Sequence, residues 1–386
     1  MICKYPLTAA ILLLAGSTVF AQTKIAPPAA KSPAKPAPVA TPGKPAPPTP
    51  AAASPAVPAA FVKPNRSLPA ITSLAFSPDG KKIAVGTYGE AVLYDATTFA
   101  QLGVFKGVED SVRALAFHPD SVQLAVGSGQ PGLSGKTVIW TTSGQSSVAY
   151  PNQFDTVESL SFRKDGKSLI AGANDNRVRF IPDVAAPTGP SLDSHNGRVH
   201  AVAFSPKNDY IFVSGAMDKI VKVWDVKKVR NVINFDQSEA GITGLVFLDN
   251  GDQFVGSSLD GKLYWWGVGY DGAKDSYNGY HFRTIGAHEG GVYCLARSEK
   301  SNRIITGGPD HSICIWDINN GGQIRAFRDA SKQPFYAAAL SPDGKIAVGG
   351  GREGLVFIWD IDANKLLMTL APPATSAASS AGGKKK

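Results

Sequence analysis

Two segments of this 386-residue chain place a histidine, a hydroxyl, an aspartate and a tryptophan in the same order. The first set is His195, Ser214, Asp218 and Trp224, and the second is His288, Thr306, Asp310 and Trp316. A histidine, a hydroxyl and an acid are the parts of a nucleophilic triad, provided that they converge on one reacting atom. No serine stands in a nucleophile-elbow sequence, and repeat positions alone nominate no triad. Repeat positions alone therefore give neither set a catalytic role.

Glycine-rich segments and the remaining histidines give little support to cofactor or metal chemistry. Residues 127–132 have the glycine spacing of a dinucleotide fingerprint, but a strand follows where a phosphate needs a helix N-terminus. Residues 134–137 lack the earlier glycine of a phosphate loop and predict an inserted hairpin loop. The six histidines lack zinc-site spacing, and residues 269–280 lack the closing glutamate of a calcium loop. We expect no cofactor or metal, and we expect a long exposed connection at 269–280.

Self-similarity along the chain indicates how its side chains are positioned. Residues 75–86 read Ala-Phe-Ser-Pro-Asp-Gly-Lys-Lys-Ile-Ala-Val-Gly and return nearly unchanged at 339–349. Weaker copies lie between them, and each copy closes on a large side chain. The closing residues are Tyr94, Trp140, Ile181, Trp224, Trp266, Trp316 and Trp359. This spacing predicts seven units of about 43 residues within residues 67–370.

Each unit is expected to hold four antiparallel strands. In the fourth unit these are residues 199–204, 211–215, 220–224 and 232–235, which are rich in branched and aromatic side chains. Ser-Pro-Asp-Gly and Asn-Asn-Gly-Gly sequences supply turns between strands. Several strands lack a polar face, as expected for sheets that neighbours cover on both sides. The sequence predicts an all-β fold, a seven-bladed β-propeller of four-stranded blades.

The repeats resemble those of the WD40 family of β-propellers. The resemblance covers nearly all of residues 67–370 and is strongest at 214–225 and 306–317, where Val-Trp-Asp and Ile-Trp-Asp close the units. It implies that each set of four side chains named above forms a hydrogen-bonded tetrad inside one blade. A connected chain of this kind satisfies polar groups that the fold buries.

The other five units depart from the family's pattern. They lack the histidine, and Thr141, Pro182 and Gly267 replace the terminal aspartate in three of them. We expect those five blades to rely on packing. Ring closure stays open, because either residues 365–370 or residues 60–63 supply the last outer strand.

One column of the repeat varies while its neighbours stay apolar, namely the second residue of each innermost strand. These residues are Thr72, Arg113, Glu158, His200, Thr243, Tyr293 and Tyr336. Because innermost strands line the axis of a propeller, the seven side chains are predicted to ring one mouth of its channel. Turns between second and third strands are expected on the same face, at Asn174, Met217, Leu259, Pro309 and Arg352.

Aromatic and arginine side chains gather in part of this ring, and such mixtures are enriched at protein interfaces. The predicted protein-binding residues are Arg113, Glu158, His200, Tyr293, Pro309, Phe335, Tyr336 and Arg352. The alternative is a ring that only solvates a water-filled channel.

Charge and composition exclude several classes of protein. The formal net charge is +8, yet residues 67–370 carry 29 basic and 31 acidic side chains. The positive excess lies near the two ends, so a nucleic-acid groove is not expected. Forty glycines and 28 prolines argue against a helix bundle, and no long apolar run beyond the N-terminus predicts a membrane span.

The two ends predict export and disorder. Residues 1–21 have the basic start, apolar run and small residues of a secretory signal peptide, with an uncleaved anchor as the alternative. Ser17 stands where a lipoprotein signal has its cysteine, so no lipid is expected. Residues 22–66 predict a disordered spacer rich in proline, alanine and lysine, and residues 371–386 a disordered basic tail. Both segments are expected to contact anionic envelope components only weakly.

Two cysteines remain after signal cleavage. Cys294 and Cys314 are predicted in the first and third strands of one blade, too far apart for a disulfide, and hence as buried free thiols.

The sequence predicts an exported, periplasmic or extracellular, WD40-like propeller that binds a protein or peptide on its loop face without catalysis. The alternative is a propeller enzyme of the hydrolase, lactonase or quinone-dependent dehydrogenase type. Glu158 and His200 are the ring members that such an enzyme would use.

Overall fold

The computed structural model describes residues 68–372, except residues 154, 187, 194 and 329–331. The described residues form strands and turns, which confirms the all-β prediction. Among them we find no helix with the length and apolar character that crossing a membrane requires. The predicted signal peptide, the spacer, the alternative closing segment 60–63 and nearly all of the predicted tail lie outside the described residues.

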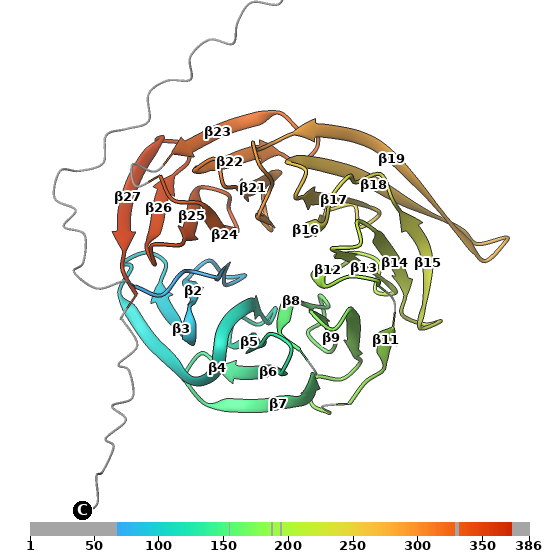
Figure 1. Cartoon of the computed structure of the whole chain (residues 1–386), viewed down its shortest axis with the longest axis horizontal. Coiled ribbons are helices and arrows are strands. Elements are labelled where there is room, and N and C mark those ends of the chain that lie inside the picture. The colour runs from blue at the N-terminus through green and yellow to red at the C-terminus, as the bar shows by residue number, and fades with distance from the viewer. Residues whose placement is uncertain (1–67, 154, 187, 194, 329–331, 373–386) are drawn as a thin grey trace, which may run out of the picture. The chain divides into compact units, whose positions relative to one another are not determined.

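The described strands form six antiparallel sheets (Figure 1). The first sheet contains β1 (Ser73–Phe76), β2 (Lys82–Gly86), β3 (Tyr88–Asp95), β4 (Gln101–Phe117), β5 (Gln123–Gln130), β6 (Ser134–Thr141) and β7 (Ser146–Gln153). The second contains β8 (Val157–Phe162), β9 (Leu169–Ala173), β10 (Arg177–Ile181) and β11 (Ser191–Asp193). The third contains β12 (Val199–Phe204), β13 (Ile211–Ala216), β14 (Val221–Asp225) and β15 (Arg230–Phe235).

The remaining three sheets each hold four consecutive strands. The fourth contains β16 (Ile242–Phe247), β17 (Gln253–Ser258), β18 (Lys262–Asp271) and β19 (Ser276–Gly286). The fifth contains β20 (Cys294–Arg297), β21 (Arg303–Gly307), β22 (Ser312–Asp317) and β23 (Gln323–Arg328). The sixth contains β24 (Phe335–Leu340), β25 (Ile346–Gly351), β26 (Val356–Asp360) and β27 (Lys365–Leu370).

The long strand β4 belongs to two groups of strands. Its first part pairs with β3 through residues 101–106, and its second part pairs with β5 through residues 110–117. Divided between these partners, the strands fall into seven groups of four. Hydrogen bonds nevertheless join β1 to β7 in a single sheet, so the number of blades stays a prediction.

The innermost strands form a closed ring around a central channel, as a β-propeller requires (Figure 1). The ring runs through β1, the second part of β4, β8, β12, β16, β20 and β24, and β24 packs against β1. At this closure the Ile71 N–H donates to the Gly351 carbonyl at 2.9 Å, and a Cβ on Gly350 would lie 2.5 Å from Ile71. Strand β27 is the outer strand of the last sheet, which supports the alternative at residues 365–370.

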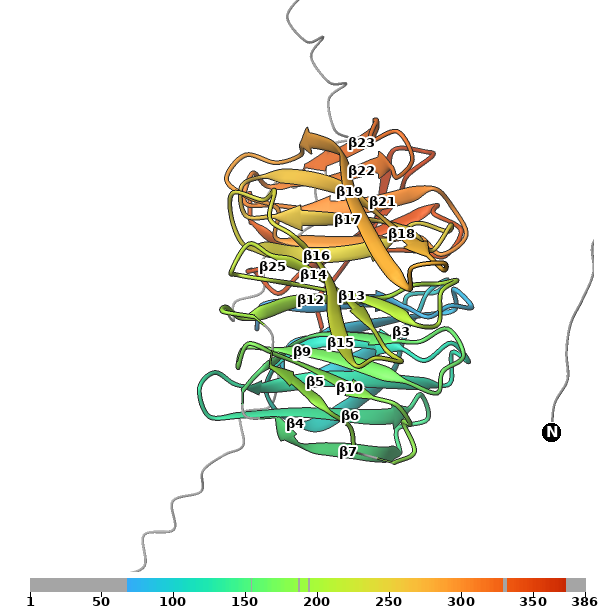
Figure 2. The same ribbon diagram turned by 90° about the vertical axis from the view of Figure 1, so that its right-hand side faces the viewer.

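Seen edge-on, the turns between strands collect at the two faces of the ring (Figure 2). One face carries the starts of the innermost strands and the turns between second and third strands. We call it the loop face. The other carries the Ser-Pro-Asp-Gly turns, in which Gly80 and Gly344 have φ near +74° and donate to the carbonyls of Ser77 and Ser341 at 2.8 Å. The turn prediction is therefore confirmed.

Apolar side chains fill the space between neighbouring sheets. Val213 and Val223 of the third sheet share one cluster with Phe254 and Trp266 of the fourth. Strand β13 is buried along its whole length, because a sheet lies against each of its faces. The absence of a polar face in such strands follows from this double burial.

Two segments that were expected as loops are strands. β18 and β19 pair out to Asp271 and Ser276, so residues 269–280 are exposed as expected but form a paired hairpin rather than a loop. The hairpin also contacts the third sheet, since the Tyr277 hydroxyl donates to Asp225 at 2.9 Å and Lys228 pairs with Asp275 at 2.6 Å. Residues 134–137 likewise lie in β6 rather than in an inserted loop.

Candidate functional site

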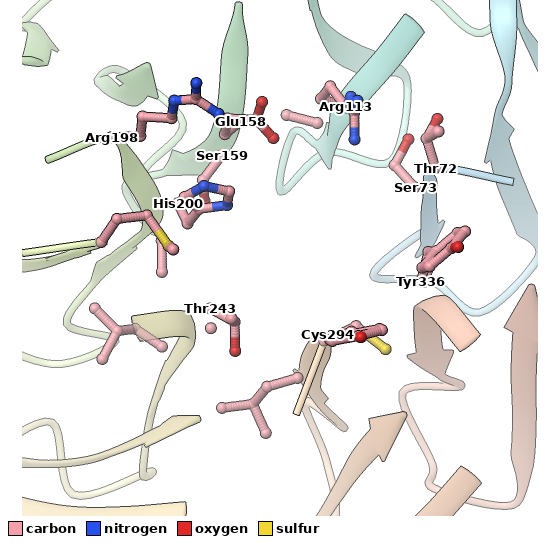
Figure 3. Close-up of a pocket in the computed structure, with 18 of the residues that line it drawn as sticks. Thr72, Ser73, Arg113, Glu158, Ser159, Arg198, His200, Thr243, Cys294 and Tyr336 are labelled. Carbon is pink, nitrogen blue, oxygen red and sulfur yellow. The ribbon is translucent and has the colours of Figure 1, made fainter. Parts of the chain in front are cut away.

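All seven predicted ring side chains border one cavity of about 840 Å³ at the loop-face mouth of the channel (Figure 3). Asn174, Met217 and Leu259, from turns on the same face, border it as well. Its volume lies in the range of ligand pockets, roughly 300–1,000 Å³. The sequence pattern therefore selected residues that the fold brings together from all seven innermost strands.

β-bulges explain why these positions vary freely. The pairing of innermost and second strands shifts register at five of the seven ring residues, and β4 has one further shift between Asp110 and Ser111. The skipped residues are Arg113, Glu158, His200, Thr243 and Tyr336. A bulged residue has no cross-strand partner, and bulges often redirect a side chain at a functional site. The backbone thus turns these side chains into the channel while their neighbours pack between sheets.

One side of the cavity is charged. Figure 3 shows Arg198, Glu158 and His200 close together, with Arg113 on the other side of Glu158. Asn174 Nδ2 donates to a Glu158 carboxylate oxygen at 3.0 Å. Within the described residues, the Arg113 and Arg198 guanidinium groups form no hydrogen bond or ion pair. Two cations therefore face the channel beside a single acid.

The surroundings of His200 favour its neutral form. Burial lowers the pKa of His200, the Glu158 carboxylate opposes that shift, and the positive charges of Arg198 and Arg113 lower the pKa further. All three charges act on one imidazole, so the four groups form a single electrostatic cluster.

The opposite side of the cavity is aromatic. The rings of Tyr293 and Tyr336 lie 6.0 Å apart at 31°, and Tyr336 is 37% exposed. Cys294, a half-buried residue, lines the same wall, and burial raises the pKa of its thiol to about 12. Both cysteines are free thiols, and Cys314 is the more buried one.

Two ring members also hold neighbouring strands together. Thr72 Oγ1 donates to the Val112 carbonyl at 2.6 Å, and Thr243 Oγ1 donates to the Val292 carbonyl at 2.7 Å. Each bond runs from one innermost strand to the chain that begins the next. These two threonines therefore stabilise the ring, whatever else they contact.

Three predicted binding residues lie outside the cavity wall. Pro309 and Arg352 stand in turns of the loop face that follow β21 and β25, and Arg352 is exposed. Phe335 is fully buried and packs against Phe357 and Trp359, so its prediction as a surface contact is wrong. Its neighbour Tyr336, which the bulge in β24 leaves without a cross-strand partner, borders the cavity instead.

Sequence reasoning missed two prominent side chains of this face. Tyr88, 57% exposed, occupies in β3 the turn position that Met217 and Pro309 hold in other sheets. Arg198 stands two residues before His200 and borders the cavity. Aligning the turn after β2 with the other turns between second and third strands identifies Tyr88. Including the residue two before each ring position in the same alignment identifies Arg198.

The histidine of the third sheet lies in a closed hydrogen-bond chain. His195 Nδ1 lies 2.9 Å from Asp218, and its Nε2 lies 2.8 Å from Ser214 Oγ. Trp224 Nε1 donates to the same hydroxyl at 2.8 Å. With the proton on Nδ1, the imidazole donates to the carboxylate and accepts from Ser214, and every group has a partner.

The fifth sheet repeats this chain with a threonine. His288 Nδ1 lies 2.9 Å from Asp310, His288 Nε2 lies 2.8 Å from Thr306 Oγ1, and Trp316 Nε1 donates to that hydroxyl at 2.8 Å. Ser312 Oγ adds a bond of 2.8 Å to Asp310. Both histidines are thus occupied inside sheets, away from the channel.

The fourth sheet has a substitute network where packing alone was expected. Ser238 Oγ, at the place of the histidine, donates 2.8 Å to Ser258 Oγ, and Tyr264 donates 2.6 Å to Asp260. Trp266 Nε1 donates to Gln237 at 2.8 Å. The expectation for this sheet is corrected, because short side chains and a tyrosine replace the missing imidazole.

The cavity offers groups for binding, and its serine and threonine hydroxyls have structural partners. Ser73 Oγ donates to the Val112 carbonyl at 2.8 Å, and Ser159 Oγ accepts from the Val202 N–H at 3.1 Å. The high pKa of Cys294 keeps that thiol protonated, and a thiol is a poor nucleophile. In the described part of the chain, no three His, Cys, Asp or Glu side chains are grouped to hold a metal ion.

Five segments match the family model described as "WD domain, G-beta repeat". They are residues 63–95, 99–141, 189–225, 279–317 and 322–360. The segments with β8–β10 and β16–β18 fall between these matches, and neither has the tetrad histidine.

Curated relatives with similar sequences cover most of the propeller. Protein tipD of Dictyostelium discoideum is 26% identical over 273 residues, which are 68% of this chain and 42% of that protein. Autophagy-related protein 16 of Arabidopsis thaliana is 25% identical over 239 residues, 60% of this chain and 45% of that protein. Actin-interacting protein 1 of Drosophila melanogaster is 22% identical over 261 residues, 66% of this chain and 41% of that protein. The chain spans less than half the length of each of these three relatives, and its repeats make it a member of the WD40 family.

Proposed function

We propose that this chain is a non-catalytic binding module that recognises a protein or peptide on its loop face. The observation that carries the proposal is the convergence of variable, bulged side chains on one cavity, with aromatic and arginine groups directed into it. Such side chains supply much of the energy of protein interfaces. A relative is named for its interaction with actin, which supports a protein as the class of partner.

Affinity capture with loop-face variants tests this function. The full chain, carrying a C-terminal tag, serves as bait in the cell fraction where the protein resides, and bound proteins are quantified by mass spectrometry. Tyr336→Ala and Arg352→Ala are expected to reduce a captured partner at least tenfold, because both side chains are exposed on the loop face.

Tyr210→Ala is the matched control. Tyr210 is also an exposed tyrosine, but it follows the turn between first and second strands and so lies on the opposite face. The control should retain the partner, and all variants should keep the unfolding temperature of the wild type. Undiminished capture by both loop-face variants would reject this surface.

We further propose that the module acts outside the cytoplasm, with residues 22–66 as a spacer. The sequence of residues 1–21 supports this location. Export is tested by intact mass and N-terminal sequencing of the protein from cells, with a mature chain expected to begin at Gln22. A chain that keeps residues 1–21 and stays in the cytoplasm would overturn it.

A further inference from the structure

Two arginines at the channel mouth have no partner on the described chain, unlike several arginines elsewhere. Arg163 pairs with Asp165 at 2.6 Å, and Arg303 pairs with Asp362 at 3.0 Å. Arg113 and Arg198 form no such pair among the described residues, although both border the cavity. Guanidinium groups form strong two-pronged hydrogen bonds with carboxylates, so these two donors are available to an anion.

The charge of the cavity wall favours an anion as well. Glu158 is the one acid on the wall, against Arg113 and Arg198. Its carboxylate already accepts a hydrogen bond from Asn174. With His200 neutral, the wall carries a net charge of +1, and a bound anion would make protonation of His200 easier.

The same side of the cavity also holds a neutral hydrogen-bond acceptor that a backbone N–H could bind. Asn174 Oδ1 is buried and has no hydrogen-bond partner within the described structure. A buried acceptor without a partner costs free energy, which a donor from a bound chain would recover. A peptide carries such a donor at every residue except proline, whereas an unprotonated inorganic anion has none.

The opposite wall of the cavity favours an apolar group in the ligand next to the anionic one. Tyr293 and Tyr336 form an aromatic surface, and the apolar side chain of Leu259 also borders the cavity. An apolar or aromatic group next to the carboxylate would cover this surface while the carboxylate meets the arginines.

We propose that the channel mouth recognises an acidic peptide, whose glutamate or aspartate carboxylates bind Arg113 and Arg198 on either side of Glu158, while an adjacent apolar side chain packs on Tyr293 and Tyr336. This inference rests on the proposed function and names its partner by chemistry. Binding weakens with salt, because exposed charge pairs are screened.

The test uses fluorescence anisotropy with two labelled heptapeptides, one of alternating glutamate and leucine and one with glutamine in place of glutamate. The acidic peptide is expected to bind the full chain saturably, and the glutamine peptide at least tenfold more weakly. Arg113→Gln and Arg198→Gln should each weaken the acidic peptide about tenfold, the equivalent of one charge-assisted bond. Arg328→Gln, which removes the same charge from the exposed outer strand β23, should change affinity less than twofold.

A second readout follows His200 itself by NMR. Saturation with the acidic peptide should raise the pKa of the His200 imidazole, because the carboxylate offsets the positive charges of Arg113 and Arg198. The glutamine peptide should leave that pKa unchanged.

Three results would overturn the inference: no saturable binding of the acidic peptide, equal binding of both peptides, or unaltered affinity in both arginine variants. The outcome separates the two proposals. A captured partner that is lost with Tyr336→Ala but kept by Arg113→Gln and Arg198→Gln leaves the binding module standing and rejects the acidic peptide. Peptide binding through the arginines without any captured partner supports the acidic-peptide site and counts against a wider protein-binding surface on the loop face.

Discussion

The two histidine networks inside the sheets and the channel mouth contain the same kinds of side chain, arranged in opposite ways. His195 and His288 are 6% and 8% exposed, and each bonds to a carboxylate and a hydroxyl within 3.0 Å. At the mouth, the His200 ring and both cavity arginines have no hydrogen-bond partner among the described residues. Polar groups that pair with one another maintain the fold, whereas polar groups left open to the channel remain available to a ligand.

Water accounts for the difference in energy between these regions. An unpaired group at the mouth that water reaches can bond to solvent, so leaving it open costs little. Inside a sheet no water compensates, and a single missing partner leaves donors and acceptors buried without bonds. The same kind of substitution should therefore lower the unfolding free energy much more inside a sheet than at the channel mouth.

The largest effect is expected for His195→Ala. The change removes two hydrogen bonds and leaves the Asp218 carboxylate and the Ser214 hydroxyl without their partner, at a cost of about 2–4 kcal/mol in unfolding free energy. His200→Ala at the mouth should cost less than about 1 kcal/mol, since its ring has no such bonds. Urea unfolding followed by tryptophan fluorescence measures both values. Equal losses would remove the distinction between the two regions.

An intermediate effect should appear in the pH dependence of stability. Burial alone would raise the pKa of Asp218, but hydrogen bonds from His195 and from two backbone N–H groups outweigh burial and lower it below its ordinary value. Asp310 follows the same balance with His288 and Ser312. Because the folded pKa is the lower one, this stabilisation is complete above the unfolded pKa and is lost as pH falls through the folded pKa.

Asp218→Asn tests that sign. Below about pH 4 the wild type should lose stability more steeply than the variant, by at most ~1.4 kcal/mol per pH unit for one proton. Asp252→Asn is the control, because Asp252 is exposed and its carboxylate accepts no hydrogen bond in the described structure. If the acid slope is the same in the Asp218 variant and the wild type, the carboxylate does not stabilise the fold through its charge.

Repeat spacing was enough to place the channel mouth, and the reason is geometrical. One ring residue recurs in each unit, and the units close around one axis, so a column in the sequence becomes a ring in space. Phe335 shows the limit of this reasoning, because a shift of one residue moves a side chain from the channel into the core. The bulge that aims Tyr336 inward depends on backbone pairing, which composition does not reveal.

Networks without a signature residue were harder to predict. The fourth sheet has a hydrogen-bond network in place of the tetrad, formed by Ser238, Ser258 and Asp260. No histidine in the sequence indicates this network. The hairpin of β18 and β19 was missed for a related reason. Its glycine and polar residues favour a loop, and only the contacts of Tyr277 with Asp225 and Lys228 hold it against the third sheet. In both places long-range contacts override local sequence preferences.

The smallest effect on stability is expected for a ring residue of the channel mouth that has a structural role. Thr243 belongs to the ring by position, but Thr243 Oγ1 donates to the Val292 carbonyl and lies 2.8 Å from the buried Ser257 Oγ. Thr243→Val keeps the shape and removes both contacts, which should cost about 1 kcal/mol in unfolding free energy. Thr97→Val, at an exposed turn where the hydroxyl has no described partner, should cost less than about 0.5 kcal/mol.

Thr243→Val should also separate the stability of the ring from its affinity for a ligand. Thr243→Val should leave affinity for the acidic peptide within twofold of the wild type, because its hydroxyl already bonds to the neighbouring strand. Loss of binding without loss of stability would mean that Thr243 contacts the ligand directly. In that case every ring residue would be expected to contact the ligand. A hydrogen bond within the protein would then not distinguish a structural side chain from a ligand-binding one at the mouth.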